Sequence, residues 1–379
     1  MKKYIKNVFR ITFIAIAGSM IITSCNKDLP NPIPLLYPKS GDTTMFGYLS
    51  RDTTLSFYRA AVVRAGLTNL FNDNTTIFTA FIPNNAAFRF SGIPSIGVVN
   101  ALPAATLGAI ISYSLIPGEQ FVDTLTASAT SFPNVQLPSF LTISSIPGTA
   151  IPINLPIFPS KRPNGFWANN IPIVASNFRV QNGIIHITAA IVNPPSNTLA
   201  GLMSTDPNLT IFNAAIARGD SGQPVGLTQI GYALAYPVAN LTVFAPTNAA
   251  FKGLINALSG GLIPLAAPDA VFIGFLNNPA FVSAQTARGI VTYHIMPYRA
   301  FSVNFPTTAT FFPTLLNQGI PLHPGVKVQA TLIGGFGAAL AVTGVGNGGI
   351  PAISTAPVNL DRNGVNGVLH VIDRVLLPQ

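Results

Sequence analysis

The chain repeats one short pattern, which reads IFTAFIPNNAAF at Ile77–Phe88 and LTVFAPTNAAF at Leu241–Phe251. Apolar and β-favouring residues alternate up to a proline, which cannot donate a hydrogen bond to a sheet and therefore predicts the end of a strand. The polar pair after the proline, Asn84-Asn85 or Thr247-Asn248, predicts the N-terminal cap of a helix. The alanines and the phenylalanine that follow are expected on the inward face of that helix.

Two further blocks recur in the same order. The second reads IISYSLIP at Ile110–Pro117 and IVTYHIMP at Ile290–Pro297, and the third reads NGIIHI at Asn182–Ile187 and NGVLHV at Asn366–Val371. The offset between the copies grows along the chain from 163 to 180 to 184 residues, so the second copy carries insertions between its blocks. Three ordered blocks indicate a duplicated domain.

Each block predicts a local structure. The second predicts an apolar helix that is stopped by its proline. In the third, Asn-Gly predicts a hairpin turn, followed in the second copy by a strand over Val368–Leu376. Helical periodicity is also present over Leu55–Phe71 and Leu209–Arg218. The sequence therefore predicts an α+β fold, a sheet sandwich with short helices packed at one side.

Together these blocks resemble the signatures of fasciclin-like domains (fasciclin I / beta-Ig-H3), here in two tandem copies. The resemblance covers residues 45–195 and 196–379, and we expect a boundary near Asn193–Ser204 with few contacts crossing between two separable domains. It implies a wedge-shaped β-sandwich with helices and an extracellular setting. It also implies a role in adhesion, or in contact with matrix or glycans, rather than in catalysis.

The first copy departs from the family pattern. In the second block, which the family carries as a Tyr-His pair, Ser114 stands in place of the histidine. In the third block, Ile187-Thr188-Ala189 follows His186 in place of the family's Val-Ile-Asp. The second copy, with Tyr293-His294, is closer, so the resemblance makes these two residues candidates for adhesion or contact. The alternative is structural, because a histidine at the end of a helix can bond the last free carbonyls and its protonated form would gain from the helix dipole.

The N-terminus predicts export. Residues 1–24 combine a basic start with a short apolar run, as in a signal peptide, and Ile22-Thr23-Ser24-Cys25 resembles a bacterial lipobox. Cys25 is then the lipidation site, the membrane is a partner through this lipid, and residues 25–44 form a proline-rich spacer. Cys25-Asn26-Lys27-Asp28 resembles the surface-export signal of Bacteroidota lipoproteins. We expect anchoring to the outer membrane, at the cell surface or facing the periplasm.

The composition excludes several classes of protein. Of 379 residues, 49% are hydrophobic and 8% are charged, which excludes a disordered polyelectrolyte, a coiled coil and a highly charged helical protein. The net charge is +9, but four of these charges lie in the first ten residues, and no basic cluster with interleaved aromatics follows. We therefore expect no nucleic-acid partner.

The residues that could carry chemistry are sparse. GVGNGG at Gly344–Gly349 matches a dinucleotide-loop pattern, but no helix is expected after it, so it predicts a hairpin turn. The four histidines lack metal-ligand spacing, and His186 and His370 are expected to make buried hydrogen bonds. Asp361 and Asp373 are better explained by solvated ion pairs than by a glycosidase pair. We expect no cofactor, no metal and no enzyme.

Trp167, the single tryptophan, leaves two interpretations open. In an exposed loop it could stack on sugar rings, and in the interior it would fill the core. The function expected from the sequence is a lipid-anchored surface protein for adhesion or matrix contact, with an extracellular protein or polysaccharide as ligand. The alternative is a glycan-binding accessory lipoprotein of a polysaccharide uptake system. Tyr293, His294 and Trp167 are the candidate contact residues.

Overall fold

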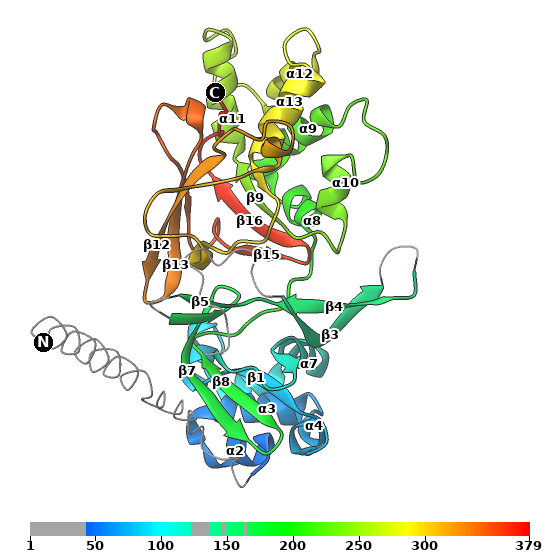
Figure 1. Cartoon of the computed structure of the whole chain (residues 1–379), viewed down its shortest axis with the longest axis vertical. Helices are drawn as coiled ribbons and strands as arrows, with labels where there is room; N and C mark the ends of the chain where they lie inside the picture. Colours follow the sequence, from blue (N-terminus) through cyan, green and yellow to red (C-terminus); the bar gives the residue numbers. More distant parts are fainter. Residues whose placement is uncertain (1–42, 123–135, 146–148, 163–164) are drawn as a thin grey trace, which may run out of the picture.

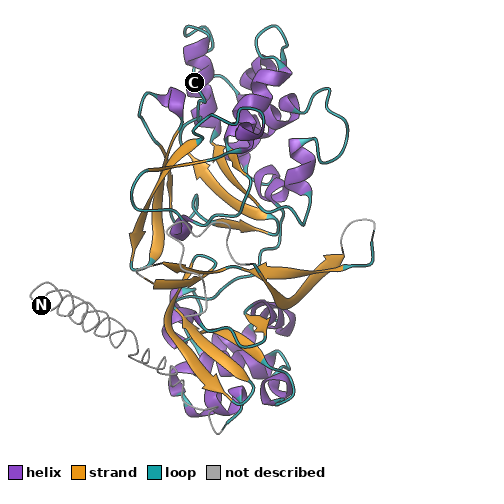
Figure 2. Cartoon of the chain, viewed as in Figure 1, coloured by secondary structure: helices purple, strands orange, loops and turns teal. Residues whose placement is uncertain are grey.

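The computed structural model describes residues 43–122, 136–145, 149–162 and 165–379. The expected signal peptide, Cys25 and nearly all of the expected spacer lie outside the described residues. The molecule is elongated, with the first repeat at one end and the second at the other (Figure 1). Most helices lie toward the two ends and the strands occupy the middle (Figure 2). Within the described residues, every helix is too short or too polar to span a bilayer.

The first repeat, called domain 1 below, runs from the first helix to β8. Its helical elements are α2 (Met45–Arg51), η1 (Thr53–Leu55), α3 (Ser56–Arg64), α4 (Thr68–Asn72), α5 (Asn85–Phe90), α6 (Ile96–Ala101) and α7 (Ala104–Tyr113). Its strands are β1 (Phe78–Pro83), β2 (Leu115–Pro117), β3 (Leu137–Ser145), β4 (Pro152–Ile157), β5 (Pro159–Arg162), β6 (Gly165–Ala168), β7 (Ile171–Val180) and β8 (Gly183–Thr188).

The second repeat, called domain 2, follows the same plan. Its helical elements are α8 (Leu199–Ser204), η3 (Pro207–Leu209), α9 (Thr210–Gly219), α10 (Ile230–Ala235), α11 (Asn248–Leu258), α12 (Asp269–Asn277), α13 (Ala284–Tyr293), η4 (Ser302–Asn304), η5 (Leu315–Gln318) and η6 (Val345–Asn347). Its strands are β9 (Leu241–Pro246), β10 (Ile295–Met296), β11 (Thr310–Phe312), β12 (Val326–Ile333), β13 (Phe336–Thr343), β14 (Ala352–Thr355), β15 (Arg362–Gly364) and β16 (Gly367–Ile372).

The central sheets of the two domains have matching topology. Domain 1 has the strand order β2-β1-β8-β7 continued by β6 and β5, and domain 2 has β10-β9-β16-β15. In each sheet the first-block strand pairs in parallel with the third-block strand, which places Phe81 beside His186 and Phe244 beside His370. The α+β architecture expected from the sequence is therefore confirmed, and the two repeats share it.

The expected strand-to-helix turn of the first block is confirmed in both copies. β1 ends at Pro83 and β9 at Pro246. The next residue caps the helix, because Asn84 Oδ1 accepts the Ala87 N–H at 2.8 Å and Thr247 Oγ1 accepts the Ala250 N–H at 3.2 Å. An N-cap acceptor satisfies one of the backbone donors that a helix start leaves free. The phenylalanines of this block are buried as expected.

Other expected boundaries are wrong in detail. The second-block helix ends at Tyr113 or Tyr293 rather than at the proline, and the residues after it form the edge strands β2 and β10. The helical stretch from Leu55 is divided into η1, α3 and α4, with Gly66 at φ +73° in the break. β16 ends at Ile372 and not at Leu376, because its pairing with β9 ends where Ile372 lies beside Pro246. The GVGNGG segment does connect two antiparallel strands, β13 and β14.

Each central sheet is buried on both faces. In domain 2, Val243 and Ala245 pack among the helices on one face, and Phe244 packs against the β11-β12-β13-β14 sheet on the other. In domain 1, Ile185 and Ile187 of β8 face the helices in the same way. Because neighbouring side chains of a strand point to opposite faces, Phe81, His186, Phe244 and His370 all lie on the face away from the helices.

Candidate functional site

The Tyr-His block of domain 2 lies in the interior at the end of α13. His294 is fully buried, its Nδ1 donates to the Ile290 carbonyl at 2.7 Å, and its Nε2 accepts the Leu376 N–H at 2.9 Å. Burial lowers the pKa of His294 to about 4, and an acceptor role for Nε2 requires the neutral ring. The expected bond to a helix carbonyl is confirmed, but a protonated ring that gains from the helix dipole is wrong.

Tyr293 connects three segments of domain 2. Its hydroxyl donates to the Gly325 carbonyl at 2.8 Å and accepts the Val345 N–H at 3.1 Å. The ring is fully buried, and burial raises the pKa of the hydroxyl. The structure therefore places both members of the block inside the domain, where an external partner would reach them only if the domain opened.

Domain 1 fills the same position with a different pair of side chains. Ser114 Oγ donates to the Ile111 carbonyl at 2.8 Å and lies 3.3 Å from the Tyr58 hydroxyl. In domain 2 the helix position of Tyr58 is occupied by Phe212, whose ring centroid is 5.8 Å from that of His294. A small polar residue beside tyrosine in one domain thus corresponds to a large polar residue beside phenylalanine in the other.

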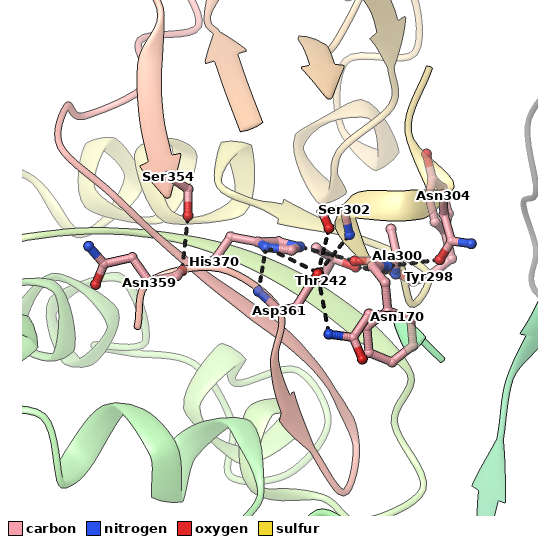
Figure 3. A network of polar contacts seen from close by, with 11 residues as sticks. Asn170, Thr242, Tyr298, Ala300, Ser302, Asn304, Ser354, Asn359, Asp361 and His370 are labelled. Atoms are coloured by element: carbon pink, nitrogen blue, oxygen red, sulfur yellow. Dashed lines mark hydrogen bonds and ion pairs between the residues drawn. The ribbon is translucent and has the colours of Figure 1, made fainter. Parts of the chain in front are cut away.

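A second buried motif is duplicated around the third-block histidines. In domain 2, Thr242 Oγ1 donates to the Tyr298 carbonyl and accepts the Ala300 N–H, both at 2.7 Å, and His370 Nε2 bonds the Ala300 carbonyl at 3.0 Å (Figure 3). His370 Nδ1 accepts the N–H of Asp361 at 3.2 Å. This fixes a neutral ring whose pKa is lowered by burial.

The corresponding atoms in domain 1 make the same bonds. Thr79 Oγ1 donates to the Gly118 carbonyl and accepts the Gln120 N–H, both at 2.8 Å, and His186 bonds the Gln120 carbonyl and the Asn177 N–H. Asn177 and Asp361 both have left-handed backbones, with φ of 65° and 56°. The expected hydrogen-bonded role of His186 and His370 is confirmed, and the motif holds the sheet to the segment after the second block.

Ser302, Asp361 and His370 have the residue types of a hydrolase triad but not its geometry. Ser302 Oγ donates to Asp361 Oδ2 rather than to the histidine, and Asp361 Oδ1 also accepts the Ser302 N–H at 2.6 Å. His370 Nε2 is occupied by a carbonyl, and Ser302 is fully buried. A nucleophile needs a base within hydrogen-bond reach and access to substrate. Asp373, the other candidate acid, instead accepts the Ile353 N–H.

Trp167 lies at the interface between the domains. It is 1% exposed, its Nε1 donates to the Gly335 carbonyl of domain 2 at 2.7 Å, and it packs with Phe158, Phe301 and Val368. Of its two interpretations, the structure favours the buried one over a sugar-stacking loop. Val365, at the β15–β16 turn, extends the interface by packing into an apolar cluster of domain 1.

Two buried arginines also lie at this interface. Arg299 donates to the side-chain oxygens of Asn240 and Asn363 and to the carbonyls of Gly364 and Val365, and its guanidinium lies 4.4 Å from the ring centroid of Phe158. Desolvation lowers its pKa to about 10. Arg162 of domain 1 donates to the carbonyls of Asn304 and Phe305. The contacts that cross between the domains therefore include buried charged side chains.

The sequence offered little warning of Arg299. It lies two residues after the second block, and the equivalent residue of domain 1 is Glu119, which forms a partly exposed ion pair with Arg179 at 3.0 Å. The one available signal was the rarity of charge in this chain, since an isolated arginine among apolar residues needs acceptors when it is buried. The described residues hold no cluster of three or more His, Cys, Asp or Glu that could bind a metal.

The comparisons with known proteins match both repeats of the chain. The family model "Fasciclin domain" matches residues 53–194 and again residues 208–378. A solved structure of a FAS1 domain pair from the insect cell adhesion molecule fasciclin I is 15% identical, with 85% of this chain and 96% of that chain covered and a TM-score of 0.35. A search of curated proteins found no match.

Proposed function

The chain belongs to the fasciclin family, with two fasciclin domains in tandem, and from this we propose that it is a lipid-anchored cell-surface protein for adhesion or matrix contact. Fasciclin domains are associated with adhesion and extracellular contact. The anchor is the acylated Cys25, which precedes domain 1 by a short proline-rich spacer. The lipid holds domain 1 at the outer membrane and leaves domain 2 at the far end of the molecule.

The observation that carries this proposal is the buried interface between the domains. Trp167 and Arg162 of domain 1 bond carbonyls of domain 2, and Arg299 supports the turn that inserts Val365 into domain 1. An interface with an apolar centre that side-chain hydrogen bonds bridge favours a fixed arrangement of domains over free relative motion. Such a pair can present a surface at a constant distance from its anchor, which suits contact with matrix or another cell.

Two observations support contact over the other candidate functions. The single tryptophan is buried at the domain interface, so it provides no exposed platform on which a glycan could stack. The buried Ser302 with its carboxylate partner lacks the base and access that hydrolysis requires. The alternative function is glycan capture for an uptake system, and the experiment described next separates it from adhesion.

The test uses cells that display the full chain and cells that carry Cys25→Ser. We expect the wild-type chain in the membrane pellet after an alkaline wash and its cells to adhere to a matrix-coated surface, while Cys25→Ser is released and adhesion is lost. Retention of Cys25→Ser in the pellet contradicts the lipid anchor. Wild-type cells that adhere no better than cells lacking the chain contradict adhesion, and capture of a soluble polysaccharide by those cells favours the alternative.

A further inference from the structure

The 375–379 segment follows β16 and lies between the helices and the β11-β12-β13-β14 sheet of domain 2. Val375 is buried in the apolar cluster of the helices, and Leu376 is buried in the apolar cluster of that sheet. The segment belongs to neither a helix nor a strand, so no ladder of backbone hydrogen bonds holds it. A segment held by a few single bonds can open locally while the rest of the domain stays folded.

Side chains of domain 2 supply most of the bonds to this segment. The Leu376 N–H donates to His294 Nε2 at 2.9 Å, and the Leu377 N–H donates to Asn347 Oδ1 at 3.0 Å. Asn347 Nδ2 also donates to the Val375 carbonyl at 2.9 Å. Two further bonds, to the carbonyls of Leu377 and Pro378, come from the Gly346 N–H and from His323 Nε2. Among these partners, His294 is the one whose accepting atom becomes a donor when the side chain gains a proton.

A proton on His294 Nε2 would place two donors against each other. The neutral ring donates through Nδ1 to the Ile290 carbonyl and accepts through Nε2, whereas the cation donates at both nitrogens. The Leu376 N–H then loses its acceptor, and the new N–H of the ring is buried against it. Opening of the segment brings water to Nε2, so protonation of the ring and opening of the segment favour each other.

The surroundings of the His294 ring are apolar. The ring centroid of Phe212 lies 5.8 Å away, and burial lowers the pKa of His294 to about 4, opposed only by the bond to the Ile290 carbonyl. The response to acid therefore comes from burial of the ring and not from a charged neighbour. The titratable side chains on the surrounding elements are Arg218 and Asp220 at the end of α9, Arg288 and Tyr293 of α13, His323, His370 of β16, and Asp373 and Arg374.

We propose that the 375–379 segment is an acid-sensitive latch of domain 2, which opens locally when His294 is protonated. Opening removes Leu376 from the space between the helices and the outer sheet. It also widens the cleft of about 710 Å³ beside α13, whose wall includes Pro378 and Gln379. The latch depends neither on lipidation nor on adhesion, so its test needs no cells and no membrane.

Domain 1 provides an internal control for the latch. Ile191 and Val192 are the counterparts of Val375 and Leu376, and they are buried in the corresponding two clusters of domain 1. Ser114 stands there in the place of His294 and has no group that titrates. Acid should therefore open the segment of domain 2 and leave that of domain 1 closed.

The test is amide hydrogen exchange of the purified full chain at pH 7.5 and pH 5, with each rate divided by the intrinsic rate of that amide at the same pH. The Leu376 and Leu377 amides report opening of the latch, and the Leu369 amide in the middle of the central sheet reports unfolding of domain 2. Local opening is recognised because Leu376 and Leu377 exchange faster than Leu369 and are insensitive to low concentrations of urea.

We expect the open fraction at Leu376 and Leu377 to rise about tenfold to thirtyfold from pH 7.5 to pH 5. This range follows from a pKa of about 4 in the closed form and a return toward the ordinary value of about 6.5 in the open form. The open fraction at Ile191 and Val192 of domain 1 should change less than threefold.

Two variants separate the proton from the bonds that merely hold the segment. In His294→Gln the amide oxygen can accept the Leu376 N–H but does not titrate, so its open fraction should change less than threefold between the two pH values. Asn347→Ala is the matched control, because it removes two other bonds to the same segment. It should raise the open fraction about tenfold at pH 7.5 and keep the wild-type response to acid.

Three results overturn the proposal. The first is an open fraction at Leu376 and Leu377 of the wild-type chain that does not rise at pH 5. The second is exchange there that is no faster than at Leu369, which would mean that acid unfolds domain 2 as a whole. The third is an equal rise in domain 1 or in His294→Gln. If His294→Gln does not fold, the wild-type chain with its domain 1 control still decides between these outcomes.

Discussion

The two domains fill the same space at the end of the second-block helix with different side chains. Domain 1 uses Ser114 beside Tyr58, and domain 2 uses His294 beside Phe212. In both, the polar side chain bonds a carbonyl in the last turn of the helix, at Ile111 or Ile290. The departure of domain 1 from the family block is therefore a compensated change of packing, and the presence or absence of the histidine is a poor guide to which domain makes contacts.

A second comparison concerns the residue two positions after each block. Glu119 of domain 1 forms an ion pair whose side chains are 27% and 36% exposed, whereas Arg299 of domain 2 is 2% exposed and bonds four acceptors. Exposed pairs contribute little because water and salt screen them, but a buried donor that is removed leaves its acceptors unsatisfied. Equivalent positions in the repeat thus carry very different shares of the stability.

The largest expected effect comes from this pair of positions. Arg299→Ala should lower the free energy of unfolding by about 3–5 kcal/mol, because two buried carbonyls and two partly buried amide oxygens lose their donor and the turn that carries Val365 loses its support. Glu119→Ala, the matched change in domain 1, should cost about 0.5 kcal/mol. Calorimetry of both variants checks this, and Arg299→Ala should also separate the unfolding of the two domains. Equal shifts in the two variants would contradict a special role for Arg299.

The next effect tests the exchange of side chains between the two blocks. His294→Ser should cost about 2–3 kcal/mol, more than a single hydrogen bond, because the Leu376 N–H loses its acceptor and a cavity remains. Adding Phe212→Tyr should recover about 1 kcal/mol by recreating the pair of domain 1. A double-mutant cycle in urea measures this coupling. Purely additive costs would show that the two pairs are not alternatives for one space.

Lowering the pH to 5 should reduce the free energy of unfolding by about 2 kcal/mol through His294 of domain 2, and not through Ser114, its counterpart in domain 1. The pKa of His294 is about 4 in the folded chain and about 6.5 when unfolded, so the unfolded state binds the proton first as the pH falls. Its stabilising contribution is complete above pH 6.5 and is lost progressively down to about pH 4. At pH 5 the loss relative to pH 7.5 should be about 2 kcal/mol smaller in His294→Ser.

Urea unfolding of wild type and His294→Ser at both pH values provides the measurement. The pKa of His370 is also lowered by burial, so His294→Ser should retain part of the acid sensitivity. Ser114 does not titrate, and Ser114→Ala in domain 1 is the control that should leave the pH dependence unchanged. Identical losses in wild type and His294→Ser would show that His294 does not resist protonation in the folded chain.

The smallest expected effect concerns the left-handed residue beside each third-block histidine. Asp361→Asn should cost about 1 kcal/mol, because an amide offers one acceptor oxygen where the carboxylate receives both Ser302 donors. Asn177→Asp in domain 1 should cost less, since the Val122 N–H keeps an oxygen acceptor. Both residue types tolerate a positive φ. Thermal melts at pH 7.5 compare the two variants. A larger cost for Asn177→Asp than for Asp361→Asn would contradict the greater importance of the domain 2 side chain.

Much of the fold could be predicted because its signals are local. The strand, proline and cap of the first block involve residues within a few positions of each other, and the structure confirms them in both copies. Boundaries were less accurate. The tyrosine at the end of the second-block helix begins a turn into an edge strand, which depends on pairing with β1 or β9 and not on the local sequence. The candidate contact residues were recognised from the sequence, and of the contact and structural interpretations that it left open, the structure favours the structural one because all three are buried.

The sequence by itself determined the duplication, the α+β class, the family and the capped turns, because repeats and caps are recorded in adjacent residues. Only the tertiary structure decided which polar groups meet. Arg299 bonds Asn240 and Asn363, about sixty residues away on either side, and Trp167 bonds Gly335 across the domain interface. Such contacts depend on the paths of the intervening loops and on the space left after the core has packed, and neither leaves a pattern in the sequence.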